Sequence, residues 1–350
     1  MNDRYRRQTA FAPLGIIGQA KLAQAHVVVC GVGALGSTIA ERLCRAGIGK
    51  LTLLDRDWVE LDNLPRQALY TEQDAAQANP KATACAEHLK AINSETEIVP
   101  HVSDLHSGNI SSLFEGADCI ADGTDNFETR YLINDYAIRH KIPWVHAGIV
   151  GAGGQGLAID PGRTACFRCL MPEPPSADLL QTCDSAGVLG PAVGMLANWQ
   201  AMEVIKILAQ GPGSIDGALR LFDLWKGEFR SVRVRRNLAT DRHPGCPSCV
   251  QDSFDFLTGA RETQARALCG RNSVQIYSRG SEFNQGENLL DLTAIADRLG
   301  LETEIKANPY FLKFLLDGIH WTVFRDGRVM MTGTEDVELA RKLFSRRIGN

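Results

Sequence analysis

Apolar runs alternate with amphipathic segments over the first half of the chain. Strand-like runs of β-branched and other apolar residues occur at 26–30, 51–54, 97–102, 118–121 and 143–148. Segments with a helical spacing of apolar residues lie between them, at 34–45, 81–92 and 127–140. Strands that alternate with helices usually form one mostly parallel sheet with helices on both faces. We therefore predict a Rossmann-like α/β fold for this part of the chain.

The pattern changes after this sheet. A glycine-rich stretch at 151–160 becomes strand-like, and the irregular stretch at 163–191 contains three cysteines, which is typical of a functional loop. The segment at 193–208 is apolar on most of its faces. This predicts a helix that is buried in the domain or lies at a subunit contact.

A second, smaller unit is predicted at the C-terminal end. The stretch at 251–271 is polar, and the elements expected after it are a strand at 273–277, a helix at 289–299, a hairpin at 321–331 that turns at Asp326-Gly327, and a helix at 337–344. We therefore predict a large α/β domain at 1–250, a linker at 251–271 and a small α+β module at 272–350.

Composition points to an ordinary enzyme in the cytoplasm. The chain of 350 residues has Lys+Arg 37 against Asp+Glu 41, a formal net charge of −4 and 44% hydrophobic residues. This balance excludes the basic excess of a nucleic-acid-binding protein and the polarity of a disordered one. The charged N-terminus predicts no signal peptide, and we expect no membrane span. In the cytoplasm the ten cysteines would be mostly reduced, so paired spacings favour metal or redox sites.

A glycine-rich turn follows the first predicted strand. Gly31, Gly33 and Gly36 would let backbone N–H groups approach a phosphate at the start of a helix. Asp55, at the end of the second strand, suits a ribose hydroxyl. The alternatives are a tight turn without a ligand and, for Asp55, a helix or turn cap. These residues fit a dinucleotide and ATP equally well.

Two cations downstream of the turn favour ATP. Arg66 and Lys81, together with Asp57 and Asn63, could bind and neutralise β- and γ-phosphates, which NAD does not require. Each cation alone is more often a solvated surface charge, so the argument depends on their joint occurrence with the glycines. Asp125, after the fourth strand, could hold Mg²⁺ or could instead cap the helix that starts near residue 127.

The cysteine spacings predict a zinc site. Cys166-x-x-Cys169 and Cys246-x-x-Cys249 would supply four thiolates for a tetrahedral Zn²⁺ ion. Four reduced cysteines without a metal and a redox pair are the alternatives. Cys183 lies in the irregular stretch and is a candidate nucleophile, although a lone cysteine is usually inert.

These motifs occur in a specific order along about two thirds of the chain: Arg4-Tyr5-Arg6-Arg7-Gln8, the Gly31 to Gly36 turn, Leu54-Asp55-Arg56-Asp57, Asn63-Leu64-Pro65-Arg66-Gln67, Pro80-Lys81, Thr124-Asp125-Asn126, Cys166-Phe167-Arg168-Cys169, Thr182-Cys183 and Cys246-Pro247-Ser248-Cys249. The ordered set resembles the MoeB/ThiF family, relatives of the ubiquitin-activating enzymes. The last hundred or so residues look like the C-terminal extension of some bacterial ThiF-like proteins. Together with the segment Phe222-Asp223-Leu224-Trp225, this extension favours a ThiF-like protein over a MoeB-like one.

The resemblance implies roles for individual residues. Asp55 would bind the ATP ribose, Asn63, Arg66 and Lys81 the phosphates, and Asp125 the Mg²⁺ ion. Arg7 would reach the triphosphate from the neighbouring subunit of a homodimer. Cys183 aligns with a cysteine that some members use for thiol chemistry on the carrier, whereas other members lack that chemistry. We expect Cys183 to be dispensable for adenylation and predict a role for it in sulfur delivery.

The implied reaction is ATP-dependent adenylation of the C-terminal Gly-Gly carboxylate of a ubiquitin-fold sulfur-carrier protein. A separate donor protein would then supply sulfur for a thiamine- or molybdopterin-type pathway. Three alternative hypotheses for the function stay open: an NAD-dependent oxidoreductase, a non-catalytic module that docks ubiquitin-fold proteins, and an enzyme that performs the same chemistry on a peptide or another small protein.

Overall fold

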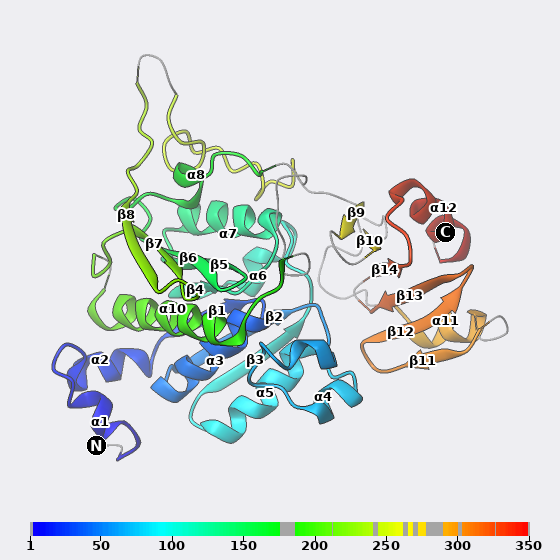
Figure 1. The fold of residues 1–350 in the computed structure, drawn as a ribbon, viewed down its shortest axis with the longest axis horizontal. Helices are drawn as coiled ribbons and strands as arrows, with labels where there is room; N and C mark the ends of the chain where they lie inside the picture. Colours follow the sequence, from blue (N-terminus) through cyan, green and yellow to red (C-terminus); the bar gives the residue numbers. More distant parts are fainter. Residues whose placement is uncertain are drawn as a thin grey trace. The chain divides into compact units, whose positions relative to one another are not determined.

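The structure is a computed structural model that describes residues 3–175, 186–211, 213–240, 244–261, 265–268, 272–277, 290–299, 303–325 and 327–348. The described residues form two compact units, one that ends at Ala260 and one that begins at Arg261 (Figure 1).

The first unit contains an eight-stranded sheet with the strand order β3-β2-β1-β4-β5-β6-β7-β8. Its strands are β1 (His26–Cys30), β2 (Lys50–Asp55), β3 (Glu97–Val102), β4 (Cys119–Asp122), β5 (Trp144–Val150), β6 (Gly153–Ile159), β7 (Ala218–Asp223) and β8 (Glu228–Arg233). Strands β3, β2, β1, β4 and β5 pair in parallel, whereas β6, β7 and β8 are antiparallel to their neighbours. The predicted mostly parallel sheet is confirmed. Strands β7 and β8 had not been predicted.

Helices cover both faces of this sheet, as predicted (Figure 1). Side chains alternate along β1, so that Val27 and Val29 pack into one hydrophobic core and Val28 and Cys30 into the other. The first core also contains residues of α3 (Ala34–Ala46), α5 (Lys81–Ile92) and α10 (Gly190–Gln210). The second contains residues of α6 (Ile110–Leu113), α7 (Phe127–His140) and α8 (Phe167–Leu170). The other helices in the described part of this unit are η1 (Asp3–Tyr5), α1 (Arg6–Thr9), α2 (Gly15–Leu22), η2 (Leu61–Asn63) and α4 (Glu72–Ala76).

The strand order reverses beside β1. The chain runs outward from β1 to β2 and β3 and then returns to β4 on the other side of β1. The carboxyl ends of β1 and β4 therefore lie side by side, because the two strands are parallel neighbours. In open α/β sheets, ligands bind in the crevice outside such a point of reversal.

The long helix α10 agrees with the predicted apolar helix at 193–208. Ten of its 21 residues are buried, and the side-chain amide of Gln200 donates hydrogen bonds to the carbonyl oxygens of Asp122 (2.8 Å) and Val145 (3.2 Å). Met202 is 54% exposed, so one side of the helix stays uncovered in the isolated chain. In the described ranges, no helix combines the length and the apolar composition needed to cross a bilayer.

The second unit contains a six-stranded antiparallel sheet in the order β11-β12-β13-β14-β10-β9. Its elements are β9 (Ala265–Leu268), β10 (Ser273–Tyr277), α11 (Leu292–Leu299), β11 (Ile305–Ala307), β12 (Phe311–Leu316), β13 (Ile319–Phe324), β14 (Arg328–Thr332) and α12 (Val337–Arg347). The predicted hairpin corresponds to β13 and β14, while Asp326 of its turn lies outside the described residues. Strand β9 falls within the stretch that the sequence assigned to a linker.

Candidate functional site

The glycine turn joins β1 to α3 at the point of strand reversal. Gly31 has a left-handed backbone with φ +74°, and its N–H donates to the Leu54 carbonyl oxygen at 2.7 Å. A Cβ atom on Gly36 would overlap the Gly31 carbonyl oxygen, and one on Gly31 would lie 2.9 Å from the carbonyl oxygen of Gly123. Gly31 and Gly36 are therefore required by close backbone packing.

Gly33 is different, because the space around it is open. A Cβ atom on Gly33 would have only Gln67 Nε2 of the described residues within 4 Å, at 3.8 Å. Gly33 is the N-cap residue of α3 and has no side chain to accept a hydrogen bond from the first turn. The first N–H groups of a helix attract an anion, and the open space leaves room for one.

Asp55 supports the glycine turn from the end of β2. Its Oδ2 accepts a hydrogen bond from Val32 N (2.8 Å), and its Oδ1 accepts one from Asp57 N (2.8 Å). Burial raises the pKa of Asp55, an effect that the charge on Lys81 opposes. A carboxylate has about four acceptor positions, so these two bonds leave capacity for a ligand hydroxyl.

Lys81 stands at the start of α5, close to the same turn. Its side chain is 8% exposed, and its Nζ lies 3.4 Å from Asp57 Oδ2. Its backbone N–H donates to the Asp57 carbonyl oxygen at 2.8 Å. Tyr70 Oη lies 2.6 Å from the Val32 carbonyl oxygen and 3.2 Å from that of Lys81. Tyr70, for which the sequence pattern gave no signal, thus joins the glycine turn to Lys81.

The segment from Asn63 to Gln67 lies beside the turn. Asn63 is buried, its Oδ1 accepts from Glu60 N (3.3 Å), and its Nδ2 donates to Asp62 Oδ1 (2.8 Å). Arg66 is half-buried, and its Nη1 donates to the Asp62 carbonyl oxygen at 2.6 Å. In this structure the Asn63 amide is thus engaged within its own turn, whereas Arg66 stays close to the surface.

A buried polar network holds the turn that follows β4. Asp122 is fully buried, its Oδ1 accepts from Thr124 N (2.9 Å) and Thr124 Oγ1 (2.6 Å), and its Oδ2 lies 2.7 Å from His146 Nδ1. Arg130 Nη2 donates to the Thr124 carbonyl oxygen at 2.6 Å. Burial acts to raise the pKa of Asp122, but the His146 hydrogen bond and the Arg130 charge outweigh it and lower that pKa. Sequence analysis missed this network.

Asp125 comes next in the chain and is exposed at the carboxyl edge of the sheet. The alternative role for Asp125 was to cap the following helix. The N-cap of α7 is instead Asn126, whose side-chain oxygen accepts from Thr129 N at 2.9 Å. Asp125 is therefore not required as the cap, and its carboxylate lies one residue before a helix N-terminus.

Arg7 lies far from the glycine turn of its own chain. It is exposed on α1, and its neighbour Gln8 donates to the Ala46 carbonyl oxygen at 2.9 Å, at the C-terminal end of α3. The glycine turn is at the other end of this helix, which has 13 residues and so a length of about 20 Å. An arginine side chain does not extend that far, so Arg7 cannot reach the turn within one chain.

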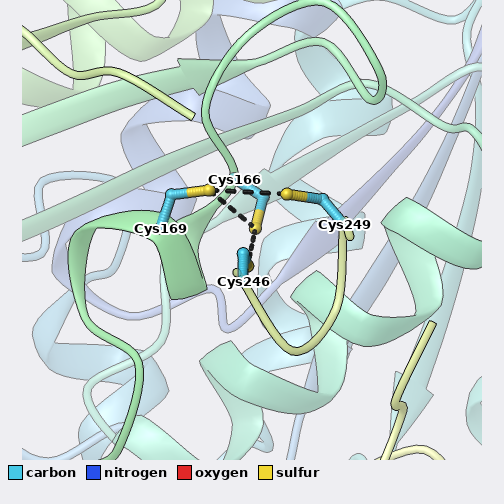
Figure 2. A group of neighbouring side chains, drawn as sticks. All are labelled: Cys166, Cys169, Cys246 and Cys249. Carbon is cyan, nitrogen blue, oxygen red and sulfur yellow. Dashed lines mark hydrogen bonds between the residues drawn. The ribbon is translucent and has the colours of Figure 1, made fainter. Parts of the chain in front are cut away.

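The four cysteines of the two predicted knuckles converge at one point, as Figure 2 shows. Their Sγ atoms all lie within 4.8 Å of one another. Individual separations are 3.5 Å for Cys166–Cys246, 3.9 Å for Cys166–Cys169 and 3.4 Å for Cys169–Cys249. A tetrahedral ion with Zn–S bonds of about 2.3 Å would set sulfur atoms about 3.8 Å apart, so the four residues fit Zn²⁺.

Helix α7 anchors both knuckles. Asn134 Oδ1 accepts from Phe167 N (3.0 Å) in the first knuckle, and Ser248 Oγ of the second donates to Asp135 Oδ1 (2.6 Å). Asn134 and Asp135 are both fully buried. In addition, Asn237 N donates to Cys169 Sγ at 3.4 Å, a bond that favours a thiolate. These contacts orient the ligands without the metal. The remaining candidate, Cys183, lies outside the described residues.

Comparison with known proteins gives concordant matches. A family model described as the ThiF family matches residues 5–248. A protein named sulfur carrier protein ThiS adenylyltransferase, from Bacillus subtilis (strain 168), is 41% identical over 352 residues that cover 100% of both chains. An adenylyltransferase and sulfurtransferase MOCS3 from Sus scrofa is 40% identical over 322 residues, 88% of this chain and 68% of that protein.

Solved structures match about two thirds of this chain. A crystal structure of E. coli MccB with MccA-N7isoASN superposes with a TM-score of 0.58 at 25% identity, and the match covers 67% of this chain and 73% of that one. A structure of E. coli MccB with ATP superposes with the same TM-score of 0.58 at 24% identity. The similarity of the second structure concerns the fold.

Proposed function

The chain belongs to the ThiF family, and on this premise we propose that it adenylates the C-terminal Gly-Gly carboxylate of a ubiquitin-fold sulfur-carrier protein with ATP. The observation that carries the proposal is the 41% identity to the B. subtilis ThiS adenylyltransferase over 100% of both chains. The resemblance inferred from the motifs is thereby confirmed. The MOCS3 relative is also named as an adenylyltransferase, so the shared name describes the same first reaction.

The nucleotide would bind at the carboxyl ends of β1 and β4. The N-terminus of α3 and the open space at Gly33 suit a phosphate group. The remaining acceptor capacity of Asp55 suits the ribose. The two features are adjacent, because Asp55 at the end of β2 accepts a hydrogen bond from the Val32 amide of the glycine turn.

Three cations would face the triphosphate. Lys81, next to the turn, and Arg66 would stabilise charge on the β- and γ-phosphates, with Asn63 beside them. Arg7 would come from the neighbouring subunit, since the length of α3 separates it from the turn of its own chain. Asp125 would hold Mg²⁺, a preferred partner of carboxylate oxygens.

The reaction needs little acid–base chemistry. The carrier's carboxylate oxygen attacks the α-phosphorus in line, a new O–P bond forms, and the bond to the β-phosphate oxygen breaks as pyrophosphate leaves. The nucleophile is already ionised at neutral pH, so no protein base is required. Mg²⁺ would supply positive charge next to the leaving pyrophosphate. The protein contributes orientation and fixed charges at the point where negative charge grows.

The zinc site would be structural. Four protein ligands leave no open position on a tetrahedral ion, so Zn²⁺ on Cys166, Cys169, Cys246 and Cys249 would not bind substrate. It would instead tie the segment after β6 to the segment after β8. Both segments pack on α7, which begins next to Asp125.

Several finer features belong to the same proposal. The full-length match to a ThiS adenylyltransferase favours a ThiS-type carrier over a molybdopterin-type carrier. We also propose a homodimer, a separate sulfur donor protein, a cytoplasmic location and no nucleic-acid partner. Residues 1–250 would carry out adenylation and 272–350 would form an accessory module, and the stretch 251–271 that joins them contributes β9 to the sheet of the second unit.

The proposal is tested by isotope exchange. The wild-type protein should exchange labelled pyrophosphate into ATP only when Mg²⁺ and a Gly-Gly-ending carrier are both present. A carrier that lacks its last glycine is the matched control and should give no exchange. Tight NAD binding without ATP binding would instead support an oxidoreductase, and ATP binding without exchange with any carrier would support a docking module.

Gly33→Val should block nucleotide binding and leave the fold intact. Only Gln67 Nε2 lies near the added Cβ, at 3.8 Å, so the valine would occupy the space proposed for phosphate. We expect ATP affinity to fall at least about tenfold by calorimetry, because the side chain displaces the anion from the helix N-terminus. Gly36→Val is the contrasting variant. Its side chain would strike the Gly31 carbonyl oxygen, so it should lower the melting temperature strongly. Unchanged ATP affinity in Gly33→Val would place the nucleotide elsewhere.

Mixing two inactive variants should restore activity if Arg7 acts across a dimer. An Arg7→Ala subunit paired with an Asp125→Ala subunit has one site with both changes and one intact site. Random pairing makes half of the dimers mixed, so about a quarter of wild-type exchange activity should return. Subunit exchange is verified by mass spectrometry of the mixture. Mixed dimers that stay inactive would show that Arg7 and Asp125 serve the same site from one chain.

A further inference from the structure

Gln67 presents a buried amide beside the glycine turn. The residue is 4% exposed, and its Oε1 has no hydrogen-bond partner among the described residues. Its Nε2 faces the open space at Gly33, where it lies 3.8 Å from the position that a Cβ atom would take. A buried amide oxygen without a partner destabilises the folded protein, so the arrangement needs a reason.

The backbone that carries Gln67 is well fixed. Gln67 N donates to the Asn63 carbonyl oxygen at 2.9 Å, and Tyr70 N donates to the Gln67 carbonyl oxygen at 3.2 Å. A Cβ atom on Gly190, at the start of α10, would lie 2.6 Å from the Pro65 carbonyl oxygen, so α10 packs closely against this segment. The Gln67 side chain is therefore attached to a well-packed backbone segment and not to a loose surface turn.

The surroundings of Nε2 attract an anion. The N-terminus of α3 begins at Gly33, and Lys81 is joined to the same turn through Tyr70. An N–H donor that points into this space adds to the positive potential of the helix end and of the lysine. The space thus offers a phosphate oxygen backbone amides and a neutral side-chain donor, and the charge of Lys81 is close enough to act on Asp55, which accepts a hydrogen bond from the same turn.

We propose that Gln67 is a further nucleotide ligand whose Nε2 donates a hydrogen bond to a phosphate oxygen of ATP at the N-terminus of α3. The proposal rests on the adenylation function proposed above. It assigns a role to a residue of the Asn63 to Gln67 motif for which sequence reasoning gave none. The unpartnered Oε1 is the stability cost of keeping an amide, and not an apolar side chain, at this buried position.

The test compares Gln67→Met with the wild-type protein in two measurements. Methionine matches the length of glutamine but carries no N–H donor and leaves no amide oxygen buried. We therefore expect the melting temperature of the nucleotide-free protein to stay equal or rise, while the Kd for ATP, measured by calorimetry, rises about tenfold. If Gln67 had a purely structural role, Gln67→Met would not weaken ATP binding while the melting temperature stayed equal or rose.

Two further variants make the test decisive. Gln67→Glu keeps the shape but places a carboxylate against phosphate, so its Kd for ATP should rise more than that of Gln67→Met. Gln73→Met changes an exposed glutamine on α4 and should leave the Kd unchanged. Wild-type-like ATP affinity in both folded Gln67 variants would overturn the proposal. If the wild-type protein itself did not bind ATP, the proposed function would fail instead.

Discussion

Replacing Lys81 by alanine is expected to slow carrier-dependent ATP–pyrophosphate exchange about a hundredfold or more, a loss of about 2.7 kcal/mol of transition-state stabilisation. The Lys81 side chain is almost buried, at 8% exposure, and its Nζ lies 3.4 Å from Asp57 Oδ2. A fixed, desolvated charge of this kind acts mainly where negative charge grows, here on the leaving pyrophosphate. The effect should therefore appear mostly in kcat.

Arg66→Ala and Asp125→Ala should have effects of similar size. Asp125 is exposed and Asn126 caps α7, so removal of the Asp125 carboxylate should leave the melting temperature unchanged. Raising the Mg²⁺ concentration should recover part of the Asp125→Ala activity, because this variant would bind the ion more weakly. It should not recover Arg66→Ala.

The matched control for Lys81 is Lys90→Ala on the same helix. Lys90 is exposed in the last turn of α5, so this change removes an equal charge away from the turn and should leave exchange within about twofold of wild type. If Lys81→Ala behaved like Lys90→Ala, the triphosphate would not lie against the start of α5.

Loss of the metal is the second change with a large expected effect. Purified protein should contain about one Zn²⁺ per chain, since four converging cysteines satisfy a tetrahedral ion completely. Cys166→Ser should lower zinc content and lower the melting temperature on the order of 10 °C, because binding free energy at a structural zinc site contributes to folding. Treatment of the wild-type protein with a strong chelator should have the same result.

A buried cysteine outside the cluster separates metal loss from simple core damage. Cys119 is fully buried in β4 and is not part of the four-cysteine group. Cys119→Ser should also destabilise the protein, but it should retain zinc. Full zinc content in Cys166→Ser, or none in the wild-type protein, would contradict a structural zinc site.

Local pattern was enough to predict the parallel part of the sheet. Valines at 27, 28 and 29 mark a strand that is buried on both faces, and such strands alternating with amphipathic helices leave few arrangements other than an α/β sheet. The antiparallel edge was harder to predict. All residues of β8 are exposed, and its apolar residues Phe229 and Val232 do not follow the alternation of a half-buried strand. Its pairing with β7 is visible only in the folded chain.

The four-cysteine cluster and the family could also be predicted from sequence. A Cys-x-x-Cys spacing already brings two sulfur atoms to one side of a short turn, so each knuckle is a local feature. That the knuckles at 166–169 and 246–249 meet was an inference from chemistry, and the convergence of their sulfur atoms agrees with it. The role of Cys183 stays a prediction, because the described residues do not include it.

Besides Asp55, only the tertiary structure identified the residues that support the glycine turn and the turn after β4. Tyr70 meets Val32 across 38 positions, and His146 meets Asp122 across 24. The type of a residue does not predict its contact partner at such sequence separations, because the contact depends on which strands become neighbours. The same holds for the buried, unpartnered oxygen of Gln67, since burial is decided by the packing of α10 and the glycine turn around it. Sequence therefore determined the chemistry available at this site, whereas the strand order decided which groups share it.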